Sequence, residues 1–324
     1  FLEGGVTDLS ISRSTFDWGI PVPWDTDQVV YVWFDALLNY ATAVGLTDAP
    51  DSEGGKKFAA TWPADVHLVG KDILRFHAVI WPAMLMAAGV EIPKKVFAHG
   101  WLLVGGEKMS KSKLTGIAPT QITDIFGSDA FRYYFMKAIG FGSDGSFSWE
   151  DLSARYNSEL ANGFGNLASR VIAMINKYFD GVVPAPAEYL EADLAIQKVA
   201  QDAVAGANSA IDKVAIHEAI AKVWTLVDEL NNYITVQAPW VLAKDEADRD
   251  RLATVLYTTA EGLRLLAVLL SPVTPKATQK LWNSIGTSLG ELSEQRIQQG
   301  EWGVLPAGTK LGELEVLFPR VEEQ

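Results

Sequence analysis

Two kinds of hydrophobic pattern divide the chain near residue 147. Before that point, short runs of β-branched and aromatic residues alternate with longer segments of helical periodicity. After it, apolar residues recur at steps of three and four over long stretches, which is the spacing of one face of an α-helix. The chain is therefore predicted to contain an α/β part, residues 1–146, and a helical part, residues 147–324.

In the α/β part, three apolar runs predict buried strands at 29–34, 66–69 and 96–98. Helical periodicity follows the first two runs and predicts helices over 35–44 and 73–88. Asp72 is predicted to be the N-cap of the second helix, because its short carboxylate can accept a free backbone N–H. Alternation of strands and helices predicts a parallel sheet of doubly wound type, which binds ligands where its strands end.

In the helical part, Ser148 is predicted to be the N-cap of a long helix whose apolar face runs over 152–178. A second helix is predicted to end before 238–240, a third to cover 245–270, and a fourth to begin at Pro275. Short connections between such helices are typical of a helical bundle. Residues 302–320 have a strand-like pattern and are expected to pack back onto the body.

Composition narrows the choice of function classes. The net charge of −13 at pH 7 opposes nucleic-acid binding, so any RNA contact must come from a local basic or polar surface. Absence of cysteine excludes disulfides and cysteine-ligated metals within these residues, and the four histidines have no metal-ligand spacing. No apolar run reaches the roughly 18 to 20 residues of a membrane span, and a cytoplasmic location is expected.

The segment 108–112, Lys-Met-Ser-Lys-Ser, is the clearest candidate for chemistry. Its two lysines lie three residues apart on a loop flanked by glycines, so both can reach a polyphosphate. There they would stabilise the charge that develops as pyrophosphate leaves. The structural alternative is a solvated surface loop, but the complete five-residue string after a predicted strand favours function.

This string is the signature loop of class I aminoacyl-tRNA synthetases, and the resemblance extends over nearly the whole chain. Segments 11–13 and 18–23 resemble the subgroup for methionine, isoleucine, leucine and valine, and segments 30–36, 70–72 and 237–240 resemble the methionyl-tRNA synthetase family. The resemblance implies the second half of a Rossmann-type parallel-sheet catalytic domain, followed by an α-helical bundle that binds the anticodon. It also implies an enzyme that activates L-methionine with ATP and transfers methionine from the adenylate to the 3′-terminal adenosine of tRNA(Met).

The resemblance assigns a role to each matching residue. Catalysis falls to Lys108 and Lys111. The ATP site would comprise Gly70, Asp72, Lys108, Met109, Ser110, Lys111 and Ser112. The methionine site would comprise Trp33, Ala36, Tyr40, Phe76, His77 and Trp81. The anticodon would contact Asn166, Arg170, Pro239 and Trp240. For each aromatic the structural alternative is core filling, although aromatic walls suit a thioether, at about 0.3 to 1.5 kcal/mol per contact.

The sequence predicts structural roles for the remaining three histidines. His67 and His99 flank predicted strands and are expected to be satisfied core histidines. His217 is expected on a helix surface.

The implied partners are ATP with Mg²⁺, L-methionine and tRNA(Met), for a monomer that contacts no membrane. The family's His-Ile-Gly-His-type turn and most of its connective domain are not found, so the isolated chain is expected to be inactive. Zinc is expected only in that missing part. Two alternatives stay open: a sister class I enzyme for another amino acid, such as an aliphatic one, and a tRNA-binding protein without activation activity. The aromatic candidates oppose the first alternative, and the intact lysine loop opposes the second.

Overall fold

The computed structural model describes residues 2–5, 8–104, 106–108, 116–286, 289–296 and 300–321, with the backbone alone at 107 and 108. The chain forms two compact units, an N-terminal unit, Phe1–Gly100, and a C-terminal unit, Trp101–Gln324. The predicted loop residues Met109, Ser110, Lys111 and Ser112 lie outside the described residues.

The N-terminal unit combines two small sheets with helices. Its strands are β1 (Ser12–Arg13), β2 (Pro21–Val22), β3 (Asp25–Val30), β4 (His67–Gly70) and β5 (Val96–His99). Its helical segments are α1 (Val32–Thr42), α2 (Glu53–Thr61), η1 (Lys71–Ile73), η2 (Phe76–Ile80) and α3 (Trp81–Ala87). β4 and β5 pair in parallel, as predicted, whereas β1 and β2 flank β3 in antiparallel register. Its core joins α1 to α3 through Leu37, Ala41, Trp81 and Leu85.

Two secondary-structure predictions for this unit are wrong. The strand expected over 29–34 ends at Val30, and α1 already begins at Val32. The β-branched run favours a strand locally, but a helix from Val32 onward buries Leu37 and Ala41 on one face, and this packing overrides the local preference. Asp72 is not an N-cap, because it lies inside the 3₁₀ turn η1, which Gly70 precedes.

The C-terminal unit is mostly helical. Its strands are β6 (Leu102–Val104), β7 (Glu107–Lys108) and β8 (Gly145–Phe147), in the order β7-β6-β8, with β6 and β8 parallel. Its helices are α4 (Pro119–Lys137, kinked at Gly127), α5 (Trp149–Arg155), η3 (Tyr156–Gly165), α6 (Asn166–Tyr178), α7 (Glu191–Asp212), α8 (Ile216–Gln237), α9 (Pro239–Leu242), η4 (Glu246–Asp248), α10 (Arg249–Leu270), α11 (Pro275–Ile285) and η6 (Leu292–Glu294).

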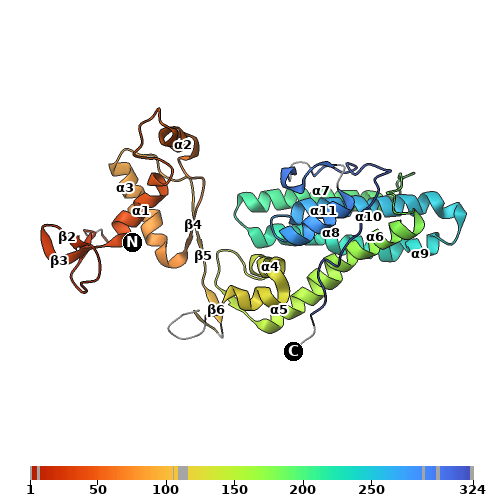
Figure 1. The fold of residues 1–324 in the computed structure, drawn as a ribbon, viewed down its shortest axis with the longest axis horizontal. Helices are drawn as coiled ribbons and strands as arrows, with labels where there is room; N and C mark the ends of the chain where they lie inside the picture. The colour runs from red at the N-terminus through yellow and green to blue at the C-terminus, as the bar shows by residue number, and fades with distance from the viewer. Residues whose placement is uncertain are drawn as a thin grey trace. The chain divides into compact units, whose positions relative to one another are not determined.

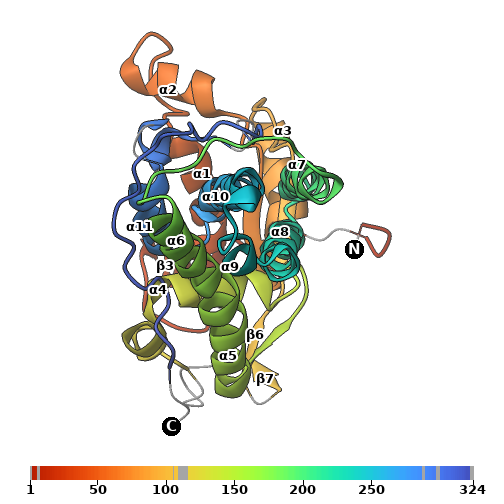
Figure 2. The ribbon, with the colours of Figure 1, turned by 90° about the vertical axis from the view of Figure 1, so that its right-hand side faces the viewer.

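Helix α10 is the centre of this unit. It packs against α6, α7, α8 and α11, as Figures 1 and 2 show. Every residue from Leu252 to Leu270 is buried, including Glu261 and Arg264, and Arg264 donates two hydrogen bonds to the Glu261 carboxylate. The stretch Glu246–Leu270 is long and apolar enough to cross a membrane, but its most apolar part is wholly buried as the core of this bundle.

The long helix predicted from Ser148 is confirmed, with one difference. The Ser148 hydroxyl accepts the backbone N–H of Asp151, and the helical path continues through α5, η3 and α6 to Tyr178. The middle segment η3 is a π-helix, which the three-and-four periodicity did not predict. The C-terminal segment, in contrast to its predicted strand pattern, forms only one isolated bridge among the described residues, Val182 with Lys310.

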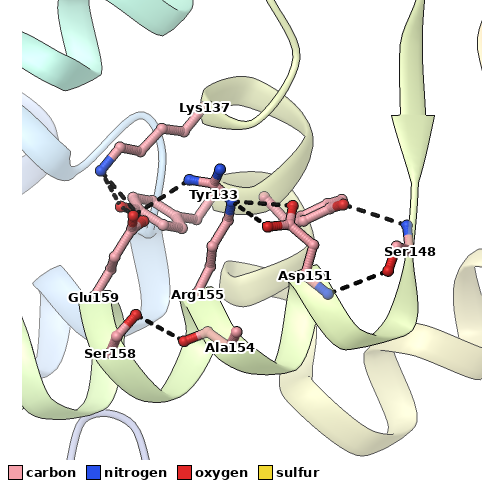
Figure 3. Close-up of polar contacts among 9 residues, drawn as sticks. Tyr133, Lys137, Ser148, Asp151, Ala154, Arg155, Ser158 and Glu159 are labelled. Atoms are coloured by element: carbon pink, nitrogen blue, oxygen red, sulfur yellow. Dashed lines mark hydrogen bonds and ion pairs between the residues drawn. The ribbon is translucent and has the colours of Figure 1, made fainter.

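A polar network fixes α4 against α5 and η3 (Figure 3). Glu159 accepts hydrogen bonds from the Tyr133 hydroxyl at 2.6 Å and from Lys137 at 3.2 Å. Arg155 bonds Asp151 at 3.0 Å and Glu159 at 3.3 Å, which links successive turns of the helix. Burial lowers the pKa of Lys137 even though Glu159 opposes that shift. The network therefore holds the start of the long helix against α4.

Candidate functional sites

The aromatic residues predicted for an amino-acid site come together in the N-terminal unit. Trp33 on α1 stacks on Phe76 of η2, with ring centroids 4.6 Å apart and planes 14° from parallel. The Trp33 and His77 rings meet edge to face at 6.4 Å. Ala36 lies three residues after Trp33 and four before Tyr40, on the same face of α1. Two segments that lie far apart in the sequence, α1 and η2, thus contribute to one cluster.

The π-helix η2 orients Phe76 and His77. A π turn inserts one extra residue per turn, and such bulges occur mostly as single turns, frequently at functional sites. The His77 ring nitrogen Nδ1 lies 3.0 Å from the carbonyl oxygen of Ile73, which can only accept, so Nδ1 carries the ring proton. In the neutral ring Nε2 is then an acceptor, and the Tyr40 hydroxyl donates to it across 2.9 Å.

His67 is part of the same cluster, although the sequence predicted only a core histidine at this position. Trp81 donates its indole N–H to Nε2 of His67 at 3.1 Å, and the His67 ring lies 4.4 Å from the Tyr40 ring. Burial, followed by the nearby His77, lowers the pKa of His67 below its ordinary value of 6.5. The alternation of strand β4 could have indicated that His67 faces inward, because His67 lies on the same face as buried Val69, two residues further on.

The other two histidines differ from each other in their surroundings. His99 is exposed at the end of β5, so its expected core role is wrong. His217 is half-buried on α8, where Nδ1 accepts the backbone N–H of Phe141 at 3.2 Å.

The turn that follows β4 carries the described part of the predicted ATP site. A Cβ on Gly70 would lie 2.6 Å from the carboxylate oxygen Oδ1 of Asp72, so a side chain at this position would displace that carboxylate. In the C-terminal unit, the backbone of Lys108 pairs with Leu103 in the β6–β7 hairpin, and the structure describes nothing of its side chain. The two described parts of this prediction belong to different units.

The residues predicted to contact an anticodon lie on the C-terminal unit, where Asn166 and Trp240 are exposed, Arg170 is half-buried and Pro239 is buried. Asn166 and Arg170 lie one helical turn apart at the start of α6, directly after the π-helix η3. Within the described part of the chain, neither side chain has a hydrogen bond or an ion pair. Beside Asn166 is a groove of about 250 Å³, lined also by Asn162, Ser169 and Arg320.

Trp240 is presented by a backbone conformation that is rare for a residue with a side chain. Ala238, which ends α8, is left-handed with φ of 43° and ψ of 60°. Pro239 is buried as the first residue of α9, and the Trp240 side chain that follows is 43% exposed. No ring or hydrogen-bond partner of this tryptophan occurs among the described residues.

A buried ionic network supports this turn. Arg251 of α10 donates two hydrogen bonds to Asp193 of α7, at 2.6 and 2.9 Å, and a third to Gln237 at 2.7 Å. Tyr233 donates its hydroxyl to the same carboxylate. The Arg251 guanidinium and these hydrogen bonds lower the pKa of Asp193, although burial opposes the shift. Gln237 directly precedes Ala238, so the network holds the last turn of α8 where the chain reverses.

The described residues contain no group of three or more histidine, aspartate or glutamate side chains placed to hold a metal ion. Magnesium was predicted only as an ion that accompanies ATP. Its ligands are therefore expected from the nucleotide and not from a set of protein side chains.

Parallel strand pairs joined to a helical C-terminal region are the architecture of class I aminoacyl-tRNA synthetases. The family model described as tRNA synthetases class I (M) matches residues 1–172, and the model for the anticodon binding domain of methionyl tRNA ligase matches residues 183–324. The chain belongs to the family of class I (M) tRNA synthetases. The resemblance and the fold class predicted from the sequence are therefore confirmed.

Named relatives agree with this assignment. The methionine--tRNA ligase of Streptomyces coelicolor is 58% identical over 100% of this chain and 60% of its own length. That of Caldanaerobacter subterraneus is 48% identical over 99% of this chain and 49% of its own length. The structure of Mycobacterium tuberculosis methionyl-tRNA synthetase in complex with methionyl-adenylate superimposes with a TM-score of 0.89, at 44% identity, over 98% of this chain and 62% of that one. The chain thus spans about half to three-fifths of these relatives.

Proposed function

We propose that the protein carrying this chain is a methionine--tRNA ligase, which activates L-methionine with ATP and transfers it to tRNA(Met). The observation that carries the proposal is the aromatic cluster around the Tyr40–His77 hydrogen bond, in a chain of the class I (M) family. Relatives that share the whole of this chain are named for that reaction.

The methionine side chain would lie against the cluster formed by Trp33, Ala36, Tyr40, Phe76, His77 and Trp81. Methionine is long, unbranched and polarizable, and its sulfur gains from contacts with aromatic rings. The Tyr40 hydroxyl and the His77 ring are held by each other and by the Ile73 carbonyl, so they present a fixed polar edge in an otherwise apolar site. Both hydrogens of this pair are used within the protein, so a preference for the thioether would come from its contacts with the aromatic rings.

Activation needs no protein nucleophile. The methionine carboxylate oxygen attacks the α-phosphorus of ATP, the bond from that phosphorus to the β-phosphate bridging oxygen breaks, and pyrophosphate leaves with the electron pair. Lys108 and Lys111 would neutralise the charge on the departing pyrophosphate, and Met109, Ser110 and Ser112 would contribute loop contacts. Asp72 would accept hydrogen bonds from the ribose, with Gly70 leaving it space. Magnesium would accompany ATP and be held by its phosphates.

Transfer then joins methionine to the RNA. The 2′-hydroxyl of the terminal adenosine attacks the carbonyl carbon of the adenylate, and AMP leaves. Asn166 and Arg170 have donors that are not used within the described protein, so they are available to bases or phosphates of the anticodon loop. Trp240, on the buried support of Pro239, offers a ring for base stacking. We also propose a monomer in the cytoplasm and a boundary between catalytic and anticodon-binding domains near residue 147.

Amino-acid-dependent exchange of pyrophosphate into ATP tests the proposal most directly. The full-length protein is assayed with methionine, leucine, isoleucine, valine and cysteine at equal concentrations. Exchange that depends on methionine alone is expected. Exchange driven by another of these amino acids would contradict the pocket assignment, and no exchange with any of them would favour an RNA-binding protein without activation activity.

Lys111→Ala tests the role of the loop. We expect exchange to slow by about 100- to 1000-fold, because a charge that acts mainly on the transition state is lost, while the KM for methionine stays the same. Lys113→Ala, a neighbouring lysine outside the signature string, is the matched control. An unchanged single-turnover rate in Lys111→Ala would remove this residue from the mechanism.

A further inference from the structure

His67 lies at the back of the aromatic cluster. It is buried at 5% exposure in β4, and its ring centroid is 4.4 Å from that of Tyr40 and 6.2 Å from those of His77 and Trp62. The Trp81 ring, on α3, is completely buried and donates its only N–H to His67. One histidine therefore contacts residues from α1 and α3 that belong to the candidate methionine site.

The hydrogen bond to Trp81 determines which form of His67 is present. An indole nitrogen can only donate, so Nε2 of His67 must be the bare nitrogen and the ring proton must lie on Nδ1. A protonated ring would place two N–H groups against each other. The titratable groups that face His67 are Tyr40 on α1 and His77 on η2, and the described structure brings no carboxylate to it. The site thus favours a neutral acceptor.

We propose that His67 is a positioning residue of the methionine site, which fixes the Trp81 indole through Nε2 and supports the Tyr40 ring from behind. This proposal rests on the proposed function. Without the acceptor, the Trp81 N–H would be a buried donor with no partner, and the indole would turn toward any polar group or water it could reach. Such a rotation changes the wall that the thioether would contact, although His67 itself would not touch the substrate.

Three variants of the full-length protein separate this role from simple core filling. His67→Gln places an amide oxygen near the position of Nε2 and keeps an acceptor. His67→Phe keeps the ring shape and removes the acceptor. Trp81→Phe, alone and combined with His67→Phe, removes the donor. His217→Gln, in the C-terminal unit, is the control for losing a half-buried histidine elsewhere.

We expect His67→Phe to raise the KM for methionine about tenfold in the exchange reaction, with the KM for ATP and kcat changing less than about twofold. His67→Gln should restore the KM to within about threefold of wild type. The double variant should be no worse than Trp81→Phe alone, because the donor is already gone. Equal KM values for His67→Phe and wild type, or equal losses in the Phe and Gln variants, would overturn the proposal.

Indole N–H signals of protein labelled with ¹⁵N-tryptophan provide a readout that needs no activity. The Trp81 resonance, assigned by its loss in Trp81→Phe, should shift in His67→Phe and stay near its wild-type position in His67→Gln. An unmoved signal in His67→Phe would also overturn the proposal. A wild-type protein without methionine-dependent exchange would instead contradict the proposed function, and the resonance test would still decide whether His67 fixes Trp81.

Discussion

The two candidate sites have opposite hydrogen-bonding designs. In the N-terminal unit, Tyr40, His77, His67 and Trp81 form two hydrogen-bonded pairs within the cluster, and Trp81 is completely buried. In the C-terminal unit, Asn166, Arg170 and Trp240 have no polar partner among the described residues, and Trp240 is 43% exposed. The first group of side chains has its hydrogen-bonding capacity used within the protein, and the second group does not.

The difference follows from what each site would bind. An apolar side chain offers few hydrogen bonds, so a pocket for it must satisfy its own polar groups or leave them buried without partners. A nucleic acid offers bases and phosphates, so its readers need free donors and an exposed ring. In the C-terminal unit, Asp193, Arg251 and Gln237 instead form a hydrogen-bonded network next to the turn that carries Trp240.

The largest expected effect comes from two arginines of the same unit. Arg251→Ala leaves the buried Asp193 carboxylate without its ion pair, so we expect the free energy of unfolding to fall by about 3 kcal/mol. Arg170→Ala removes a side chain without a described partner and should change that free energy by less than about 0.5 kcal/mol. Urea unfolding, monitored by circular dichroism, measures the free energy of unfolding of both variants and the wild type.

The same two variants should rank in the opposite order when the direct loss of tRNA(Met) binding is measured. Arg170→Ala is expected to weaken binding of tRNA(Met) while the protein stays fully folded. If Arg170→Ala instead destabilised the unit as much as Arg251→Ala, Arg170 would be a structural residue. The contrast between residues that would contact RNA and residues that stabilise the fold would then be lost.

Trp240→Ala tests the exposed ring. Loss of one stacked base costs about 1 to 3 kcal/mol, so we expect the KM for tRNA in aminoacylation to rise by about 5- to 150-fold. Methionine-dependent exchange without tRNA should be unchanged. Trp240→Phe keeps an aromatic face and is the matched control. Equal KM values for the alanine variant and wild type would mean that the ring plugs a space between helices.

Tyr40→Phe tests the saturated site and should have a smaller effect. The substitution leaves the buried Nε2 of His77 without its donor, and we expect the KM for methionine to rise by about fivefold, equivalent to about 1 kcal/mol. Binding of tRNA should not change. Tyr31→Phe is the control, because the Tyr31 hydroxyl makes no hydrogen bond among the described residues. A KM for methionine that is equal in Tyr40→Phe and wild type would show that the pair does not shape the pocket.

The sequence predicted features that depend on neighbouring residues better than features that depend on contacts between distant residues. Local signals identified the Ser148 cap, the parallel strands and the helix break before Pro239, because caps, periodicity and proline act over a few residues. The helices α2, α4 and α7 were not predicted, and the start of α1 was placed too late. In α7 the buried positions do recur at steps of three and four, but after Ile196 they are all alanines, which give a weak apolar signal.

The sites show the same limit. The candidate methionine residues were grouped by resemblance, and the structure brings Trp33, Tyr40, Phe76 and His77 together through α1 and a π turn. Neither π-helix has a sequence signature that the three-and-four pattern reveals. His67 was not identified as part of the site, because its partner Trp81 is 14 residues away and only the fold makes the hydrogen bond.

The smallest effect is the pH dependence of stability that His67 produces. Burial and His77 lower its pKa below 6.5, so between the lowered value and 6.5 the unfolded chain binds a proton that the folded chain does not. The free energy of unfolding must therefore fall as pH falls through that window. His67→Gln has no such proton to bind and should flatten the decline below pH 6.5. Thermal unfolding at a series of pH values measures the slopes. Parallel curves for wild type and His67→Gln would mean that His67 accepts a proton in the folded state as readily as in the unfolded chain, and that the Trp81 hydrogen bond does not hold its ring neutral.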